Sequence, residues 1–126
     1  MSSNSSTDTI PSHFVVDRQK WFRGLGFKES RLLRSDGKMC CLGFVSKQCG
    51  VPDAQLLGIG SPCMLPEAEQ LKLPVFMRGD YRIVPSTDKC MEAMSVNDNL
   101  NIPDDDREGR LQSIFESNGY KLQFIN

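Results

Sequence analysis

The sequence predicts a single α+β domain in which short helices pack on a small, mostly antiparallel sheet. The spacing of Leu111, Ile114 and Phe115 predicts an amphipathic helix near the C-terminus. Alternating apolar and polar residues over 120–124 predict a strand directly after that helix. A chain of 126 residues, 39% hydrophobic and 25% charged, suits one domain with one core.

Residues 1–13 are predicted to be a disordered or loosely held tail, and residues 14–126 to be the globular domain. The tail is rich in Ser, Thr, Asn and Asp, and it ends at His13, the single histidine. The chain has neither a run of 18 apolar residues nor the pattern of a secretion signal, so we expect no membrane partner. Five cysteines in such a chain are typical of reduced thiols, which indicates a cytoplasmic location.

The first helix is predicted to begin at Asp17, whose side chain can cap it. Trp21, Phe22 and Leu25 would face the core, while the basic residues between them would face water. Two glycines, at positions 24 and 26, would end this helix.

The stretch from Ser30 to Gly50 organises the next part of the chain. Residues 31–34 are predicted to form a strand that ends at residues 35–38, because Ser-Asp-Gly-Lys is a strong turn signal. Leu42, Val45 and Cys49 then recur at helical spacing, followed by a glycine and a proline where a helix would stop.

Prolines and glycines divide residues 51–80, so only short elements are expected there. Pro66 is a good start for a helix that would stop before Pro74. The later elements are predicted in this order: a strand over residues 81–84, a helix from Ser86 or Thr87 through Met94, a helix after Pro103 that closes at Asn118, and the final strand. We expect the final strand to pair with another strand.

Cys40 and Cys41 fall in the first turn of the helix within the Ser30–Gly50 stretch, where the helix dipole lowers a thiol pKa. A cysteine nucleophile usually needs a histidine base, and the single histidine lies in the predicted tail. Core packing therefore explains the cysteine pair better than catalysis, and we expect the protein not to be an enzyme. None of the five cysteines forms a C-x-x-C pair, so we expect no metal and no cofactor.

Several motifs resemble a group of small, mostly uncharacterised phage and prophage proteins with a CCLGV-like motif and a downstream "ND … R … IF … G" tail. The resemblance covers roughly residues 18–125 and depends on Leu33-Arg34, Asp36-Gly37-Lys38, Cys40-Cys41-Leu42-Gly43-Phe44, Asn97-Asp98, Arg107, Ile114-Phe115 and Gly119. Where the group often has a third cysteine, this chain has Ser46. The resemblance implies phage origin and interference with host machinery or host defence.

A candidate binding site combines Arg31, Arg34, Asp36, Asn97 and Asp98. Residues 18–38 carry seven basic and two acidic side chains, a local charge of +5. The arginines can donate to phosphate or carboxylate, the aspartates can accept, and Asn97 can do both. In the simpler interpretation, Asn97 and Asp98 form a turn and Asp36 belongs to a hairpin.

Three classes of function stay open at this point. The first is a phage-type accessory protein that antagonises a host process, as an anti-defence inhibitor, by masking a host protein in the host cytoplasm. The second is a basic pocket that sequesters a small phosphorylated or nucleotide signalling molecule, and the third is a cysteine-dependent enzyme. A net charge of −1 argues against a dedicated binder of duplex DNA.

Overall fold

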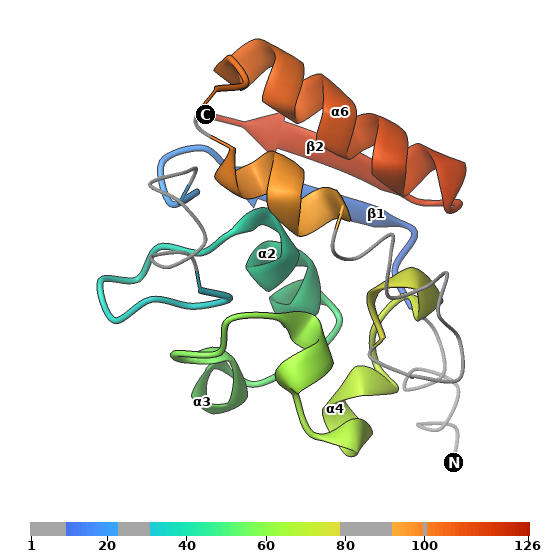
Figure 1. Cartoon of the computed structure of the whole chain (residues 1–126). Coiled ribbons are helices and arrows are strands. Elements are labelled where there is room, and N and C mark those ends of the chain that lie inside the picture. Colours follow the sequence, from blue (N-terminus) through green and yellow to red (C-terminus); the bar gives the residue numbers. More distant parts are fainter. Residues whose placement is uncertain (1–9, 23–30, 79–91, 100) are drawn as a thin grey trace.

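The computed structural model describes residues 10–22, 31–78, 92–99 and 101–126. Within these ranges, helices and strands form one small α+β unit, as the sequence predicts (Figure 1). The elements are β1 (His13–Asp17), α2 (Cys41–Gln48), α3 (Asp53–Leu56), η1 (Pro62–Met64), α4 (Glu67–Gln70), η2 (Val75–Met77), a helix over residues 92–98, α6 (Asp104–Ser117) and β2 (Lys121–Ile125). None of the described helices is long and apolar enough to cross a membrane.

β1 and β2 pair in parallel, from His13 opposite Lys121 to Asp17 opposite Ile125. The prediction of a mostly antiparallel sheet was therefore wrong for the described residues, whereas the prediction that the final strand pairs was confirmed. The two strands come from opposite ends of the sequence, so the chain between them is a long crossover that carries the helices. Parallel strands require such a crossover, because a tight hairpin can join only antiparallel strands.

β1 occupies residues that were predicted to be tail and helix start. Its Phe14 and Val16 are fully buried, and the residues between them are more exposed, which is the alternation of a strand with one face in the core. His13 is the first residue of β1, and its ring Nε2 lies 2.9 Å from Oε1 of Gln123 in β2. The prediction that His13 lies in the tail was wrong.

The helix predicted from Asp17 was also wrong over the described residues. A turn follows β1, and Trp21 then forms a bridge with Met39. Phe22 N–H donates to the Met39 carbonyl at 2.7 Å, and Met39 N–H donates to the Lys20 carbonyl at 3.0 Å. These long-range backbone hydrogen bonds replace the local ones of a helix; the end predicted for the helix, residues 23–26, lies outside the described residues.

The core lies between the sheet and the helices. α6 packs against β2 and α2 packs against β1, so the inner face of the sheet meets both helices (Figure 1). Phe14 of β1 meets Phe115 of α6 edge-on, with ring centroids 6.2 Å apart. Phe124 of β2 stacks at a tilt on Trp21, at 4.8 Å. The aromatic side chains thus join the two strands to the segments around them.

α2 forms where the sequence predicts a helix, and Gly50 after it has the positive φ (+102°) that a helix C-cap needs. Leu42 and Val45 are fully buried. Near its end, Gln48 reaches the outer edge of β1: Val15 N–H donates to Gln48 Oε1 at 2.9 Å, and Gln48 Nε2 donates to the Val15 carbonyl at 2.6 Å. The side-chain amide therefore takes the place of a third strand.

The predicted strand over residues 31–34 was wrong: Leu33 makes only an isolated bridge with Leu57, and Leu32 lies at a bend. The predicted turn at residues 35–38 was confirmed, because Arg34 N–H donates to the Lys38 carbonyl at 2.8 Å and Gly37 has a φ of +89°. Leu32 is fully buried beneath α2.

The remaining predictions concern the second half of the chain. α4 begins after Pro66 as predicted and ends at Gln70, and α6 and β2 match the predicted helix and strand. The predicted strand over residues 81–84 and the predicted start of the next helix lie outside the described residues. The described part of that helix runs over residues 92–98, past the predicted end at Met94.

Candidate functional site

Asn97, one of the predicted site residues, is buried and joins three segments of the chain. Only 1% of its surface is exposed. Its Oδ1 accepts hydrogen bonds from Trp21 Nε1 at 2.7 Å and from the backbone N–H of Cys41 at 3.0 Å. Its Nδ2 donates to the Phe22 carbonyl at 3.2 Å and to Asp98 Oδ1 at 2.8 Å. Two donors and two acceptors are the full capacity of a carboxamide, so this side chain has none left for a ligand.

The bond from Cys41 N–H also completes the start of α2. The residue before the helix, Cys40, makes no side-chain capping hydrogen bond. The first amide of α2 is satisfied instead by Asn97, which belongs to the helix over residues 92–98. A capping group from a distant segment ties the position of α2 to that helix.

Arg107 fixes the loop that follows Asn97. Its guanidinium is buried and donates to the carbonyls of Asn97 at 3.3 Å, Asn99 at 2.6 Å and Ile102 at 2.9 Å. In the sequence, Arg107 stands out only as part of the tail motif of the resemblance. Arg107 lies on the same face of α6 as Leu111, Ile114 and Phe115, so the helical spacing indicates that it faces the core. Arginine is seldom buried in this way.

Arg34 and Asp36 lie together at the surface. The Arg34 guanidinium pairs with the Asp36 carboxylate at 3.2 Å and stacks over the ring of Phe22, 4.1 Å from its centroid. The N–H of Lys38 donates to Asp36 Oδ1 at 3.0 Å, and this bond, together with Arg34, holds the pKa of Asp36 below its ordinary value. The Arg34 guanidinium and the Asp36 carboxylate thus interact with each other and with neighbouring groups of the chain.

The structure thus brings the two halves of the predicted site to one place, because Phe22 links them. Its ring carries Arg34, and its carbonyl accepts from Asn97. Asn97 and Asp98 are buried, whereas Arg34 and Asp36 keep some exposure. Arg31 is half-buried, and its carbonyl accepts from Cys40 N–H at 3.0 Å. The polar groups of this junction form hydrogen bonds and ion pairs with other groups of the same chain.

The described cysteines Cys40, Cys41 and Cys49 are free thiols. Burial raises the pKa of Cys40 to about 12, and the hydrogen bonds from nearby backbone N–H groups offset only part of this effect. Burial also raises the pKa of Cys49 to about 12. Such thiols are protonated and unreactive near neutral pH. Among the described residues, no group of three or more His, Cys, Asp or Glu side chains could hold a metal ion.

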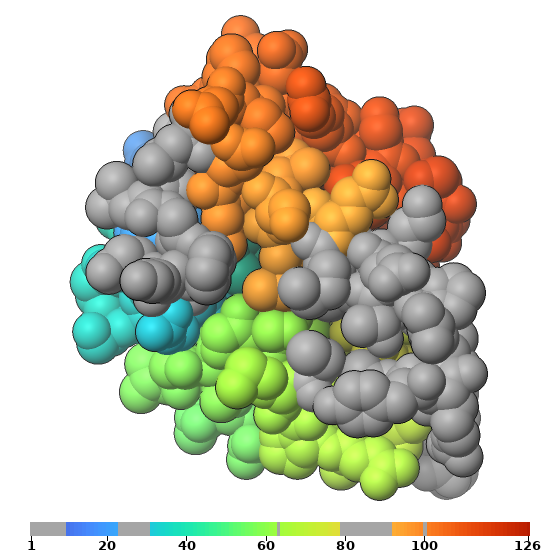
Figure 2. Space-filling model, in the orientation of Figure 1, coloured from blue at the N-terminus to red at the C-terminus, as the bar shows by residue number. Residues whose placement is uncertain are grey.

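Sequence reasoning did not predict the exposed apolar surface, which we define as Leu57, Met64, Leu71 and Val75. These residues are 54%, 64%, 62% and 48% exposed. They belong to the segment containing α3, η1, α4 and η2, which forms the end of the molecule opposite α6 (Figures 1 and 2). The proline and glycine spacing of this segment predicted short elements but not which apolar residues would stay outside.

Two ion pairs lie in or near the same part of the chain. Lys72 Nζ lies 2.7 Å from Glu69 Oε1, and Lys47 Nζ lies 3.4 Å from Asp53 Oδ1.

Comparison with known proteins found no matching family model, no matching curated protein and no matching solved structure.

Proposed function

We propose that this chain is a small phage-type accessory protein that antagonises a host process, as an anti-defence inhibitor, by binding a host protein in the host cytoplasm and masking its surface. The observation that carries the proposal is the exposed apolar surface of Leu57, Met64, Leu71 and Val75. The phage origin of the proposal comes from the sequence resemblance.

Closeness in the sequence is what distinguishes these four residues from ordinary exposed apolar residues. Among the described residues, the large apolar residues that remain exposed are these four and Ile125. All four fall at positions 57 to 75: Met64 and Val75 lie in η1 and η2, and Leu57 and Leu71 directly follow α3 and α4. Single exposed apolar residues need no explanation, but several in one short segment indicate a surface that another protein covers.

A basic pocket for a phosphorylated molecule receives less support. Arg34 is paired with Asp36 and stacked on Phe22, and the Asn97 carboxamide is saturated by the chain itself. A cysteine enzyme also receives less support, because the pKa of Cys40 is raised far above neutral.

The test is affinity capture from a lysate of the bacterium that carries the sequence, followed by mass spectrometry of retained proteins and of released small molecules. The unmodified chain is compared with a Leu71→Gln, Val75→Gln double variant. Ile125→Gln is the matched control, since Ile125 is an exposed apolar residue of β2, outside the segment. We expect a host protein retained by the unmodified chain and the control to be lost by the double variant.

Two results would contradict the proposal. Equal retention of the host protein by all three chains would mean that the apolar surface does not bind it. Release of a phosphorylated small molecule without any retained protein would favour the second class of function.

A further inference from the structure

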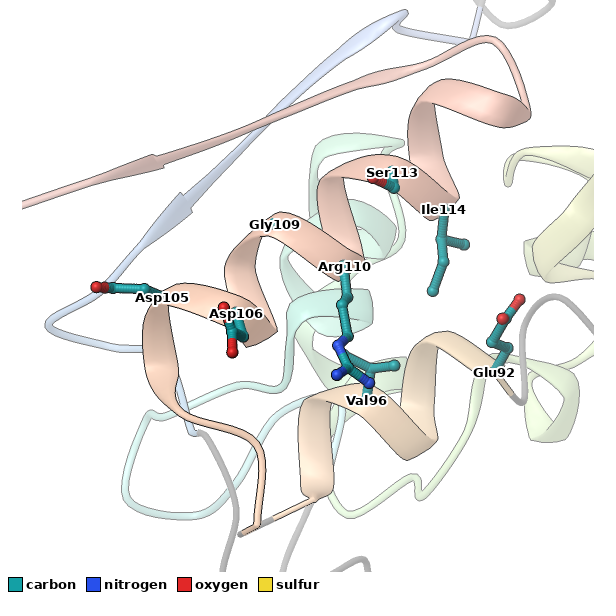
Figure 3. Close-up of a pocket in the computed structure, with 8 residues that line it drawn as sticks. All are labelled: Glu92, Val96, Asp105, Asp106, Gly109, Arg110, Ser113 and Ile114. Carbon is teal, nitrogen blue, oxygen red and sulfur yellow. The ribbon is translucent and has the colours of Figure 1, made fainter.

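A groove separates the helix over residues 92–98 from the first turns of α6 (Figure 3). Its volume is about 600 Å³, within the range of peptide and small-molecule sites. The residues that line it are Glu92 and Val96 on one side and Asp105, Asp106, Gly109, Arg110, Ser113 and Ile114 on the other. None of these belongs to the apolar surface of residues 57–75, so the groove is a separate feature.

Gly109 leaves the backbone of α6 uncovered in this groove. Glycine within a helix costs about 1 kcal/mol relative to alanine. Packing does not require it, because a Cβ at position 109 would meet nothing within 4 Å. A helical glycine without a packing reason, in the wall of a groove, lets another molecule approach the helix backbone closely.

The charged side chains of the groove include both acidic and basic groups. Figure 3 shows Arg110 extending from α6 toward Val96, with Asp106 on one side of it and Glu92 on the other. Within the described residues, neither Asp106 nor Arg110 forms an ion pair, although four positions separate them on one helix. Three carboxylates and one guanidinium give the lining a net negative charge.

The lining excludes two simple ligand types. Phosphate or another small anion would meet three carboxylates. A small polyamine would carry charge of the same sign as Arg110. It would also offer no hydrogen-bond acceptor to the guanidinium N–H groups of Arg110 or to the Ser113 hydroxyl. The occupant must offer hydrogen-bond acceptors, a positive charge and an apolar group together.

A peptide segment has all three. We propose that the groove binds a short segment of a partner protein in which apolar residues alternate with lysine or arginine. Its apolar side chain packs on Val96 and Ile114, its backbone carbonyls accept from Arg110 and Ser113, and its cationic side chain faces Asp106. Charge complementarity selects the basic segment, and the bare backbone at Gly109 admits it.

The test uses a fluorescein-labelled octapeptide of alternating leucine and lysine, with leucine–glutamate and serine–lysine versions as comparisons. Fluorescence anisotropy of the full chain with each peptide measures affinity. We expect the leucine–lysine peptide to bind about tenfold or more tightly than either comparison, and increasing salt to weaken it. Amide NMR shifts should change at Val96, Gly109 and Ser113.

Variants place the binding in the groove. Gly109→Trp fills the groove, and Gly109→Lys covers the helix backbone and adds a charge of the same sign as the peptide; each should weaken peptide binding about tenfold or more. Asp106→Asn should weaken it about threefold, whereas Glu116→Gln, a neutralisation on α6 outside the groove, should not. Thermal midpoints of all variants confirm that they are folded, and two substitutions at position 109 keep the test valid if one fails to fold.

Three outcomes would overturn the proposal. Unchanged affinity in the folded variants of position 109 would place peptide binding elsewhere. Equal binding of the glutamate peptide would remove the charge argument. Full competition by spermidine at equal concentration would assign the groove to small cations instead of a peptide.

Discussion

Gly43 of α2 lies directly against the backbone carbonyl of Leu32, so closely that a Cβ at position 43 would overlap the carbonyl oxygen. The contact is with backbone on both sides, and neither side can move away without shifting a whole segment. It explains the glycine in the Cys40–Phe44 motif physically: the segment over residues 31–34 can pass beneath α2 only where the helix has no side chain.

Gly43→Ala should therefore lower the free energy of unfolding by about 3 kcal/mol or more, because the added methyl group forces α2 away from Leu32. Gly109→Ala is the matched control, a helical glycine whose Cβ would meet nothing. It should raise the free energy of unfolding by about 1 kcal/mol through helix propensity. Urea denaturation of the two variants measures both values, and effects of the same sign would refute the close contact.

Asn97→Ala should cost about 2 to 4 kcal/mol of stability. It leaves the buried donors of Trp21 and Cys41 without an acceptor, and each such loss costs about 1 to 3 kcal/mol. Asn99→Ala is the control, since Asn99 is exposed and its side chain accepts only within its own turn. A red shift of Trp21 fluorescence below the unfolding transition would show the loss locally; equal denaturation midpoints for Asn97→Ala and Asn99→Ala would contradict the junction.

The elements predicted correctly are those that the chain signals locally. α6 begins with acidic residues after Pro103, carries an inward apolar stripe and closes before Gly119, whose φ is +91°. β1 could not be found in this way. Its alternation spans only five residues, and its partner β2 lies at the other end of the chain, so no nearby turn reveals the pairing.

The predicted site shows the same limit. The sequence identified Asn97, Asp98, Arg34 and Asp36 as polar residues in distinctive positions, and the structure does bring them together around Phe22. Burial decides whether such groups face a ligand or one another. That depends on Trp21 and Cys41, which reach Asn97 from 76 and 56 positions away, and no local pattern encodes those distances.

Gln48→Ala should cost about 1 to 2 kcal/mol, because Val15 loses the partners of both its N–H and its carbonyl at the outer edge of β1. The amide of Val15 should then exchange hydrogen faster than its neighbours in β1 that face β2. Lys47→Ala is the matched control, because the surface ion pair of Lys47 with Asp53 contributes little. If Val15 exchange is the same in both variants, the side chain does not act as an edge strand.

Alkaline pH should destabilise the fold through its buried thiols. Burial raises the pKa of Cys40 and of Cys49 from 9.0 to about 12, so in this range the folded state holds protons that the unfolded state releases. The stabilisation is fully present below pH 9 and is lost as the pH rises from about 9 toward 12. The buried thiol of Cys40 contributes a slope of at most about 1.4 kcal/mol per pH unit within that range, and the partly exposed thiol of Cys49 contributes less.

Urea denaturation of the parent chain and of Cys40→Ala between pH 8 and pH 10.5 isolates the contribution of one thiol. The variant starts less stable, because a buried side chain is truncated. Its stability should fall less steeply above pH 9, so the difference between the two chains narrows as the pH rises. Parallel curves would mean that Cys40 titrates alike in both states, and rapid alkylation of native Cys40 at pH 7.5 would show a reactive thiolate that the packing around α2 does not allow.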